Sequence, residues 1–437
     1  MLYAVNGRHI AEIDCVPGPY GAWTLVDQGS LDLRGIPELQ ERAQSAVRML
    51  EDGSVRSKYP PGSSLAAVPF FLLYPLTGTE PDLSHSAMAR LGKWVAASYA
   101  AGVAVLVYLL CQRLAPGGAL AAALFVGAGT TLWSTASQAL WSHGPATFFV
   151  CGALFCLARR TEGPRPLDAL LAGTALGLAL LCRPSTALFA AASATALVAD
   201  RHWREGALTL VPVVLLGMGL IAYNHIHFDA PIAGGYLNEA QRFDGALTSG
   251  LSGLLTSPSR GILVYSPALW LLPFGLQKLR GDCELSQSQR RLLIGWMIGA
   301  LVTLLLYARW YVWWGGWSFG PRFLTETVPV LGVVVALAYE QLGERFGRSG
   351  RALAWGLIAL SIAVHFVGVF GHGSDWMVGK LGTDMFALGD TQIAAHARYL
   401  WAERPAALLL PLSVVVWALG RSFARTSRPT DSTVNRS

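Results

Sequence analysis

Two acidic residues near the start of the chain are spaced so that they can serve one reaction. Glu12 and Asp14 lie two positions apart in the stretch AEIDCVP. Two carboxylates at this spacing share one site only on a turn or an extended segment. A carboxylate held beside a hydroxyl can accept its proton. The pattern is short, and a pair of solvated loop acids is the alternative interpretation.

A second group of polar residues lies in the middle of the chain. His225 and His227, followed by Asp229, have side chains that can bind a metal, but without a firm third ligand this spacing is more typical of a helix end. We therefore expect no metal site there. Further along, LLTSPSRGILVYSP places Ser-Pro and Arg-Gly turn signals between apolar segments. This loop is expected to present Arg260 and Tyr265 at the start of the next apolar run.

The third stretch, RWYVWWGGWSFGPRF, places tryptophans among glycines and ends beside an arginine. Tryptophan rings gather where a helix leaves a bilayer, but an aromatic belt does not account for the glycines, which let backbone approach a ligand. We expect Trp313, Trp314 and Trp317 to form both a belt and part of a groove. A belt alone is the alternative. For Arg322, the alternative role is an i,i+4 pair with Glu326.

Composition indicates that a membrane protein carries these residues. Of its 437 residues, 53% are hydrophobic and 14% are charged, against about 25% charged in soluble domains. A bilayer crossing needs about 20 mostly apolar residues. The expected fold is therefore an all-α, polytopic transmembrane helical bundle. Eleven apolar runs, several of them short, are its candidate spans: 91–111, 117–135, 139–158, 167–182, 184–199, 206–223, 262–278, 292–308, 322–341, 352–371 and 405–420.

The arginines and lysines set the expected orientation. After residue 80, most of them fall in alternate loops on one side, which the positive-inside rule assigns to the cytoplasm together with the C-terminal tail. The net charge of +6 follows from this topology, and no motif points to nucleic acid. The six cysteines show neither a disulfide framework nor metal-ligand spacing. The N-terminus is then external, yet MLYAVNGRHI resembles neither a signal peptide nor a span. We therefore expect either a first helix encoded upstream or an unusual family member without that helix.

The chain divides into four expected parts. Residues 1–61 form a first external loop, 62–78 a helix in the outer interface, 79–420 the membrane domain, and 421–437 a disordered cytoplasmic tail. Three external loops belong to the membrane domain: 224–261, 309–321 and 372–404.

Taken in order, these features resemble a known enzyme family. The E-x-D, KYPPG before a surface helix, LLTSPSRGILVYSP and WWGGWSFGPRFL are together similar to bacterial C-type glycosyltransferases (the GT-C superfamily). That family is related in architecture to protein O-mannosyltransferases and to the lipid A aminoarabinose transferase. The resemblance implies transfer of a sugar from a polyprenyl-phosphate carrier to an envelope glycan, lipid or protein outside the bacterial cytoplasmic membrane. It also implies a first transmembrane helix that ends just before the acid, and the eleven residues printed before Glu12 are too few for such a span.

The resemblance implies roles for the residues above. Asp14 matches the family's reactive carboxylate, with Glu12 as its partner. An acceptor hydroxyl that attacks the anomeric carbon needs a base. The departing lipid phosphate needs cations; arginine can donate two parallel hydrogen bonds to it, and lysine acts as a flexible point charge. Phosphate binding is expected from Lys58, Arg260 and Arg322, and a carrier or sugar groove from Tyr59, Tyr265, Trp313, Trp314 and Trp317. No cofactor is firmly implied, although a divalent metal is compatible with the chemistry.

Two other classes of protein share this architecture. A secondary transporter usually has an internal repeat and ionisable residues near the membrane centre, and neither stands out in this sequence. A noncatalytic envelope-assembly subunit would differ only in lacking working acids. The ordered set of motifs favours the glycosyltransferase over both.

Overall fold

Most of the described chain is helical, as the composition predicts. The computed structural model describes residues 2–42, 44–74, 82–159, 165–281, 284–373, 376 and 383–409. Within these residues one antiparallel hairpin, β1 (Val47–Met49) with β2 (Val55–Ser57), departs from the all-α expectation. The helices are α1 (Pro17–Gln28), α2 (Pro37–Arg42), α3 (Gly62–Phe71), α5 (His85–Leu114), α6 (Ala119–Ala128), α7 (His143–Ala158), α8 (Pro166–Cys182), α9 (Ala187–Ala199), α10 (Trp203–Phe228), α11 (Leu247–Thr256), α12 (Ile262–Tyr265), α13 (Leu272–Arg280), α14 (Gln287–Ala308), α15 (Val328–Phe370) and α16 (Gln392–Glu403).

Among the described residues, four helical segments are long and apolar enough to cross a bilayer. They are α5, α10, α14 and the segment Arg322–Phe370, which contains α15. Gly347 interrupts α15 with φ 59° and ψ −131°, a left-handed conformation that glycine adopts without strain. The two halves of α15 correspond to the predicted runs 322–341 and 352–371. The chain therefore returns after the bend, and Phe319 packs beside His365 with ring centroids 6.2 Å apart.

Several other predicted runs are divided into shorter helices. A π-helical turn at Leu132–Ala136 follows the end of α6, and the run 262–278 consists of α12, a 3₁₀ turn at Pro267–Leu271, and α13. Proline explains the second division, because it lacks the N–H that a continuous helix needs. Within the predicted interfacial helix 62–78 the structure has α3 over Gly62–Phe71, and 75–78 lie outside the described residues. Its position at the membrane interface stays a prediction. The run 405–420 lies mostly outside them, and the tail 421–437 entirely so.

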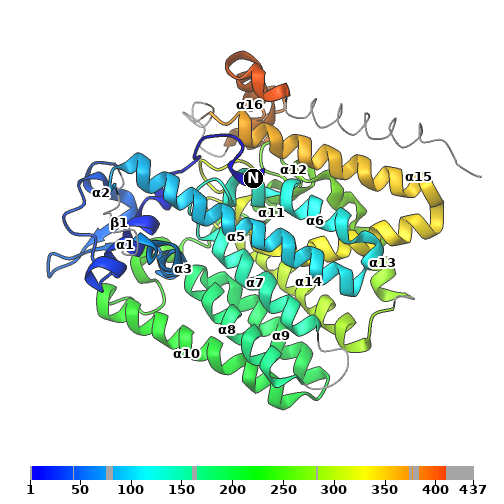
Figure 1. The fold of residues 1–437 in the computed structure, drawn as a ribbon, viewed down its shortest axis with the longest axis horizontal. Coiled ribbons are helices and arrows are strands. Elements are labelled where there is room, and N and C mark those ends of the chain that lie inside the picture. The colour runs from blue at the N-terminus through cyan, green and yellow to red at the C-terminus, as the bar shows by residue number, and fades with distance from the viewer. Residues whose placement is uncertain are drawn as a thin grey trace, which may run out of the picture.

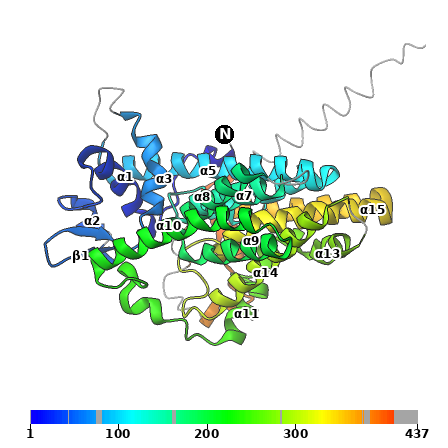
Figure 2. The same ribbon diagram turned by 90° about the horizontal axis from the view of Figure 1, so that it is seen from below.

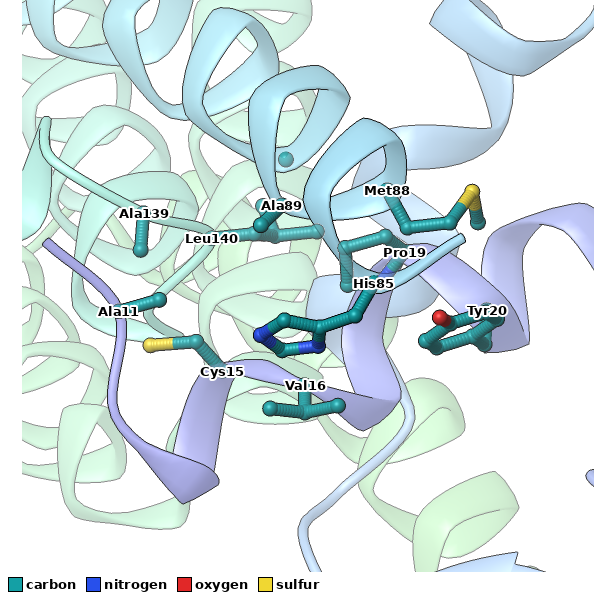
Figure 3. A pocket seen from close by; sticks show the side chains of 11 residues that line it. Ala11, Cys15, Val16, Pro19, Tyr20, His85, Met88, Ala89, Ala139 and Leu140 are labelled. Atoms are coloured by element: carbon teal, nitrogen blue, oxygen red, sulfur yellow. The ribbon is translucent and has the colours of Figure 1, made fainter. Parts of the chain in front are cut away.

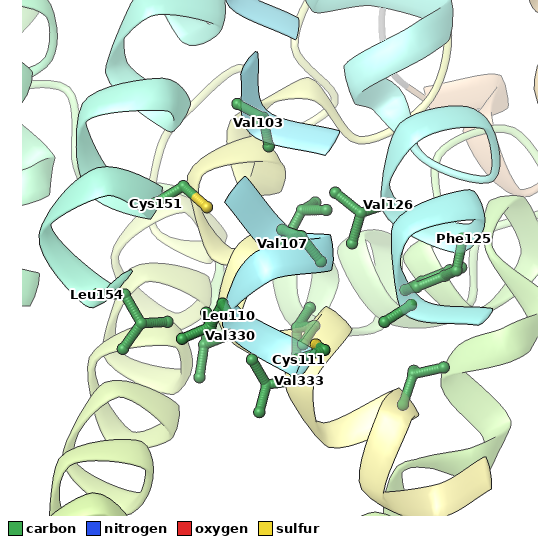
Figure 4. Packing of buried hydrophobic residues seen from close by; sticks show 14 of the residues in the cluster. Val103, Val107, Leu110, Cys111, Phe125, Val126, Cys151, Leu154, Val330 and Val333 are labelled. Atoms are coloured by element: carbon green, nitrogen blue, oxygen red, sulfur yellow. The ribbon is translucent and has the colours of Figure 1, made fainter. Parts of the chain in front are cut away.

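The sequence of α5 shows how one helix serves both a core and a lipid surface. Ala100, Val103, Val107 and Leu110 recur at helical spacing and are fully buried. Val105, on another side of the helix, is 56% exposed and also apolar. Figure 4 shows the buried stripe packed against α6, α7 and α15, through residues that include Val126, Cys151, Leu154, Val330 and Val333.

The N-terminal segment gathers at one end of the helical body. Figure 1 shows α1, α2 and β1 at that end and the bend of α15 at the opposite end, and Figure 2 shows the same separation from below. Tyr20, Leu39, Val55 and Phe71 join α1, α2, the hairpin and α3 in one apolar cluster. The predicted external loop 372–404 contains α16, which packs on α15 near His372.

Candidate functional site

The E-x-D lies at the N-terminal end of the body, where an extended residue leads into a turn. Glu12 has extended backbone (φ −113°, ψ 172°), and Asp14 follows in the 3₁₀ turn Ile13–Cys15 that leads into α1. Behind this turn Cys15 lines a small cavity against α5, which Figure 3 shows together with His85 and Leu140. The turn is thus packed onto the helical body through Cys15.

A buried lysine ties the preceding segment to the same body. Lys93 of α5 is 7% exposed and donates to Gln138 Oε1 (3.1 Å), to Asn6 and to the carbonyl of Arg8. The backbone N–H of Ile10 also donates to the carbonyl of Gln138 at 3.1 Å. These bonds fix the chain just before the two acids.

Both oxygens of the Asp14 carboxylate have partners from distant parts of the chain. The hydroxyl of Tyr59 donates to Oδ1 at 2.6 Å, and Arg322 Nη1 lies 2.9 Å from Oδ2. Burial raises the pKa of Asp14, but the charge of Arg322 and these hydrogen bonds outweigh burial and hold the pKa below its ordinary value. Burial and the nearby Asp14 raise the pKa of the Tyr59 hydroxyl, which therefore stays protonated and donates.

Glu12 has a different environment from Asp14. Burial and the neighbouring charge of Asp14 raise the pKa of Glu12 to about 7, against the opposing effect of Arg322. Its half-buried carboxylate shows neither a hydrogen bond nor an ion pair within the described ranges of the chain. The two acids are therefore one ionised, anchored carboxylate and one that titrates near neutral pH.

Arg322 pairs with Asp14, and the alternative pairing with Glu326 is not observed. Its guanidinium also lies over the Trp141 ring, 4.5 Å from the centroid. Gly315 and Gly316 have φ values of 77° and 66°, and a Cβ at Gly315 would lie 3.1 Å from Arg322 Cγ. The interleaved glycines thus permit a left-handed backbone and the close approach of this arginine.

Lys58 follows β2 and stands beside the Asp14 site. Its Nζ lies 2.7 Å from Glu239 Oε2, and Arg48 Nη2 lies 3.2 Å from the other oxygen. Nζ is also 5.7 Å from the centroids of both Tyr59 and Tyr236. Glu239 and Tyr236 come from the predicted external loop 224–261, so this loop covers the site from the side of the hairpin.

The structure does not bring Arg260 to this carboxylate. The side chain is fully buried and donates to the carbonyls of Trp314 (2.7 Å), Gly316 (2.8 Å) and Ser259 (2.9 Å), and to Gln392. In the described structure the guanidinium supports the backbone of the aromatic segment from behind. Phosphate binding by Arg260 stays a prediction.

The residues predicted to line a groove have unequal exposure. Tyr265 is fully buried and its hydroxyl donates to the carbonyl of Ser259 at 2.8 Å, while Trp313 is 6% exposed. Trp314 is half-buried, and Trp317 is 42% exposed. Tyr59 is the one of this set that contacts Asp14 directly. Tyr265 and Trp313 act as packing residues here, and the groove itself stays a prediction.

A further set of polar side chains beside the site is missing from the sequence-based prediction. It consists of His143, Arg183, Tyr236, Tyr307 and Glu326. Arg183 falls between two predicted spans and Glu326 within a third. An ionisable residue at such a place is itself a functional signal, and it could have identified these two. Nothing in the local sequence indicates that they contact each other.

Comparison with known proteins shows what the fold of this chain resembles. Residues 87–227, spanning α5 to α10, match the profile of a family described as dolichyl-phosphate-mannose-protein mannosyltransferase. The fold is similar to that of ArnT from Cupriavidus metallidurans in the apo state, with a TM-score of 0.51 at 13% identity, covering 91% of this chain and 75% of ArnT. The protein is thus a multi-pass membrane protein with a GT-C-like fold, and the predicted resemblance is confirmed.

Other comparisons add less. The archaeal oligosaccharyltransferase AglB from Archaeoglobus fulgidus, solved with an inhibitory peptide and a dolichol-phosphate, has a TM-score of 0.47 at 13% identity, with 83% of this chain covering 51% of AglB. None of the curated proteins matches the chain significantly. The family match concerns a glycosyltransferase family, while the sugar and the acceptor are not defined by it.

Proposed function

We propose that this protein transfers a sugar from a polyprenyl-phosphate carrier to an acceptor hydroxyl on the extracytoplasmic side of a bacterial cytoplasmic membrane. The observation that carries the proposal is the convergence of Arg322 and Tyr59 on Asp14, with Lys58 beside them. This arrangement supplies a carboxylate for a proton and cations for a phosphate within one site. The predicted eleven-span topology, with the site at the outer ends of the helices, belongs to the same proposal.

The proposed reaction uses each of these groups once. The acceptor oxygen attacks the anomeric carbon and its proton passes to Asp14, while the bond between that carbon and the phosphate oxygen breaks. The carrier leaves as a phosphate anion that Arg322 and Lys58 stabilise. A divalent metal is compatible with this scheme but supplies no step in it.

The present ion pairs suggest how the donor activates the base. Arg322 is paired with Asp14 and Lys58 with Glu239, so a carrier phosphate must exchange with these carboxylates. When phosphate draws Arg322 away, the main charge that lowers the pKa of Asp14 is weakened. Asp14 then becomes a stronger base at the moment when the donor is bound.

The test is transfer by the purified protein in nanodiscs, with radiolabelled polyprenyl-phosphate sugars and an envelope extract as acceptor source. Asp14→Asn keeps the size and removes the base, so turnover should fall by about 10²–10⁴-fold. Asp27→Asn, an exposed acid of α1, is the matched control and should transfer normally. Wild-type turnover by Asp14→Asn would remove Asp14 as the base, and absence of transfer by the wild type across several carriers would overturn the function.

A further inference from the structure

A second polar cluster lies behind Arg322 and uses residues that the proposed chemistry does not employ. The side chains of Glu326 and His143 are each 2% exposed, and that of Arg183 is 12% exposed. Glu326 Oε1 lies 2.8 Å from His143 Nδ1 and 2.9 Å from Arg183 Nε. Arg183 also donates to the hydroxyl of Tyr307. The four residues come from α7, the junction of α8 and α9, α14, and the turn before α15.

The contacts of His143 define its protonation state. Arg183 Nη1 lies 3.2 Å from His143 Nε2, and an arginine can only donate. Nε2 must therefore accept, so the proton is on Nδ1 and is donated to Glu326. The ring is neutral, and the charges of Arg183 and Glu326 cancel. The cluster as a whole is neutral and leaves no positive charge for a ligand.

The cluster holds the turn that carries Arg322. Arg322 and Glu326 lie in the same 3₁₀ turn, Arg322–Thr327. Within that turn Phe323 stacks on Tyr307, with centroids 4.6 Å apart and an interplanar angle of 6°. The Trp141 ring under the guanidinium of Arg322 comes from the segment just before α7. Tyr307 of the cluster therefore contacts the turn through Phe323, and Trp141, next to the cluster, contacts Arg322 itself.

A buried ion pair of this kind is weak evidence for a stabilising role. Desolvation of a buried ion pair can exceed its Coulomb gain, and apolar replacements are often equally stable. Glu326 Oε2 is moreover buried with no hydrogen-bond partner in the described part of the chain, which costs further free energy. Ionisable residues kept at such cost among membrane helices are functional candidates.

We propose that Glu326 is a positioning residue for donor binding, which holds the turn through His143 and Arg183 so that Arg322 meets Asp14 and the carrier phosphate. Glu326 also neutralises Arg183. Both arginines lie near the Phe323 ring, with Cζ of Arg183 5.9 Å and Cζ of Arg322 5.2 Å from its centroid. The second arginine then does not compete for the phosphate. The inference rests on the proposed function, because it requires that Arg322 binds phosphate.

The experiment is a double-mutant cycle read by binding of polyprenyl phosphate, without sugar, to the full-length protein in nanodiscs. Glu326→Gln removes the charge and keeps the shape, and it should weaken binding about tenfold. In an Arg322→Ala background the same change should cost less than twofold, because the residue being positioned is absent. Glu340→Gln is the matched control. Its carboxylate lies in α15, the helix that follows the turn, and accepts the N–H of Gly117 at 2.8 Å, far from the site.

Each outcome decides one of the two claims. Equal loss from Glu326→Gln in both backgrounds would show a general structural role and overturn the inference, as would unchanged binding by Glu326→Gln. If Arg322→Ala binds weakly, the proposed function stays intact whether Glu326→Gln shows equal loss in both backgrounds or unchanged binding. Wild-type protein that does not bind the lipid, or Arg322→Ala that binds like the wild type, would overturn phosphate binding by Arg322 and the inference with it.

A milder variant covers the case in which Glu326→Gln does not fold. Tyr307→Phe removes the hydroxyl that Arg183 contacts and keeps the ring that stacks on Phe323. It should weaken lipid binding by a smaller factor and show the same dependence on Arg322. Equal losses with and without Arg322 would again contradict the positioning role.

Discussion

At the scale of single residues, two acids two positions apart have acquired opposite pKa shifts. The pKa of Asp14 is lowered and that of Glu12 is raised to about 7, and such a separation is how neighbouring carboxylates take different roles. The two pKa shifts therefore change the folding stability with pH in opposite directions. Asp14 contributes stability that is lost as pH falls through its lowered pKa. Glu12 binds its proton more tightly in the folded state, so stability declines as pH rises from its ordinary 4.5 to about 7.

The pH dependence of donor binding should therefore report on Glu12. Ionisation near pH 7 places a second negative charge beside Asp14, so affinity for polyprenyl phosphate should weaken as pH rises through this range. Glu12→Gln should remove that step while retaining the titration of the lipid phosphate itself. The measurement is lipid binding from pH 5.5 to 8.5 for both proteins. Superimposable profiles would show that Glu12 does not titrate near the ligand.

The two cations should differ in how much binding they contribute. Arg322→Ala removes a charge-assisted hydrogen bond to phosphate, worth about 1.5–3 kcal/mol, and should also slow departure of the carrier. Lys58→Ala should have a milder effect because a flexible ammonium is a less pre-organised partner. Binding and transfer rates measured in one preparation test the order. A larger loss at Lys58 than at Arg322 would reverse it.

At the scale of elements, the hairpin and the loop 224–261 meet through Glu239. Arg48, in β1, and Lys58, just after β2, contact the two oxygens of this carboxylate. Arg48 Nε also donates to the carbonyl of Gly235 at 3.1 Å. A phosphate that binds Lys58 meets a cation already paired with Glu239, so the negative charge of the loop opposes the donor at this position.

Removal of that negative charge should strengthen donor binding. Glu239→Gln eliminates the negative charge held by Lys58, and the affinity for polyprenyl phosphate should rise severalfold. Asp244→Asn, an exposed acid of the same loop, serves as the control and should bind like the wild type. Weaker binding by Glu239→Gln would instead mean that the loop contact helps to build the site.

At the scale of the whole molecule, the candidate site and the bend of α15 lie at opposite ends. Lys278 Nζ lies 2.7 Å from Glu344 Oε2 close to the bend, whereas Arg322 precedes the same helix at the site. About twenty helical residues between them rise roughly 30 Å, the thickness of a hydrocarbon core. The fold thus separates the arginine-rich loops near 280 and 347 from the acids.

Reporter fusions should show the corresponding orientation. Fusions after residues 285, 347 and 430 should report the cytoplasm, and fusions after 245 and 385 should report the outside, because the positive-inside rule assigns these loops. A cytoplasmic signal from the fusion after 245 would place the site residues on the other side of the membrane. The proposed extracytoplasmic transfer would then be wrong.

Local composition by itself determined the helical membrane class and the approximate positions of the long apolar helices, since apolar periodicity acts over short distances. Long-range packing decided the site. Arg322 could pair with Glu326, four residues away. In the fold, however, Arg322 pairs with Asp14, and Glu326 pairs with His143 and Arg183. Such partners depend on which helix ends the bundle brings together, because a buried charge takes whichever counter-charge packing places within reach, and a single sequence does not encode that placement locally.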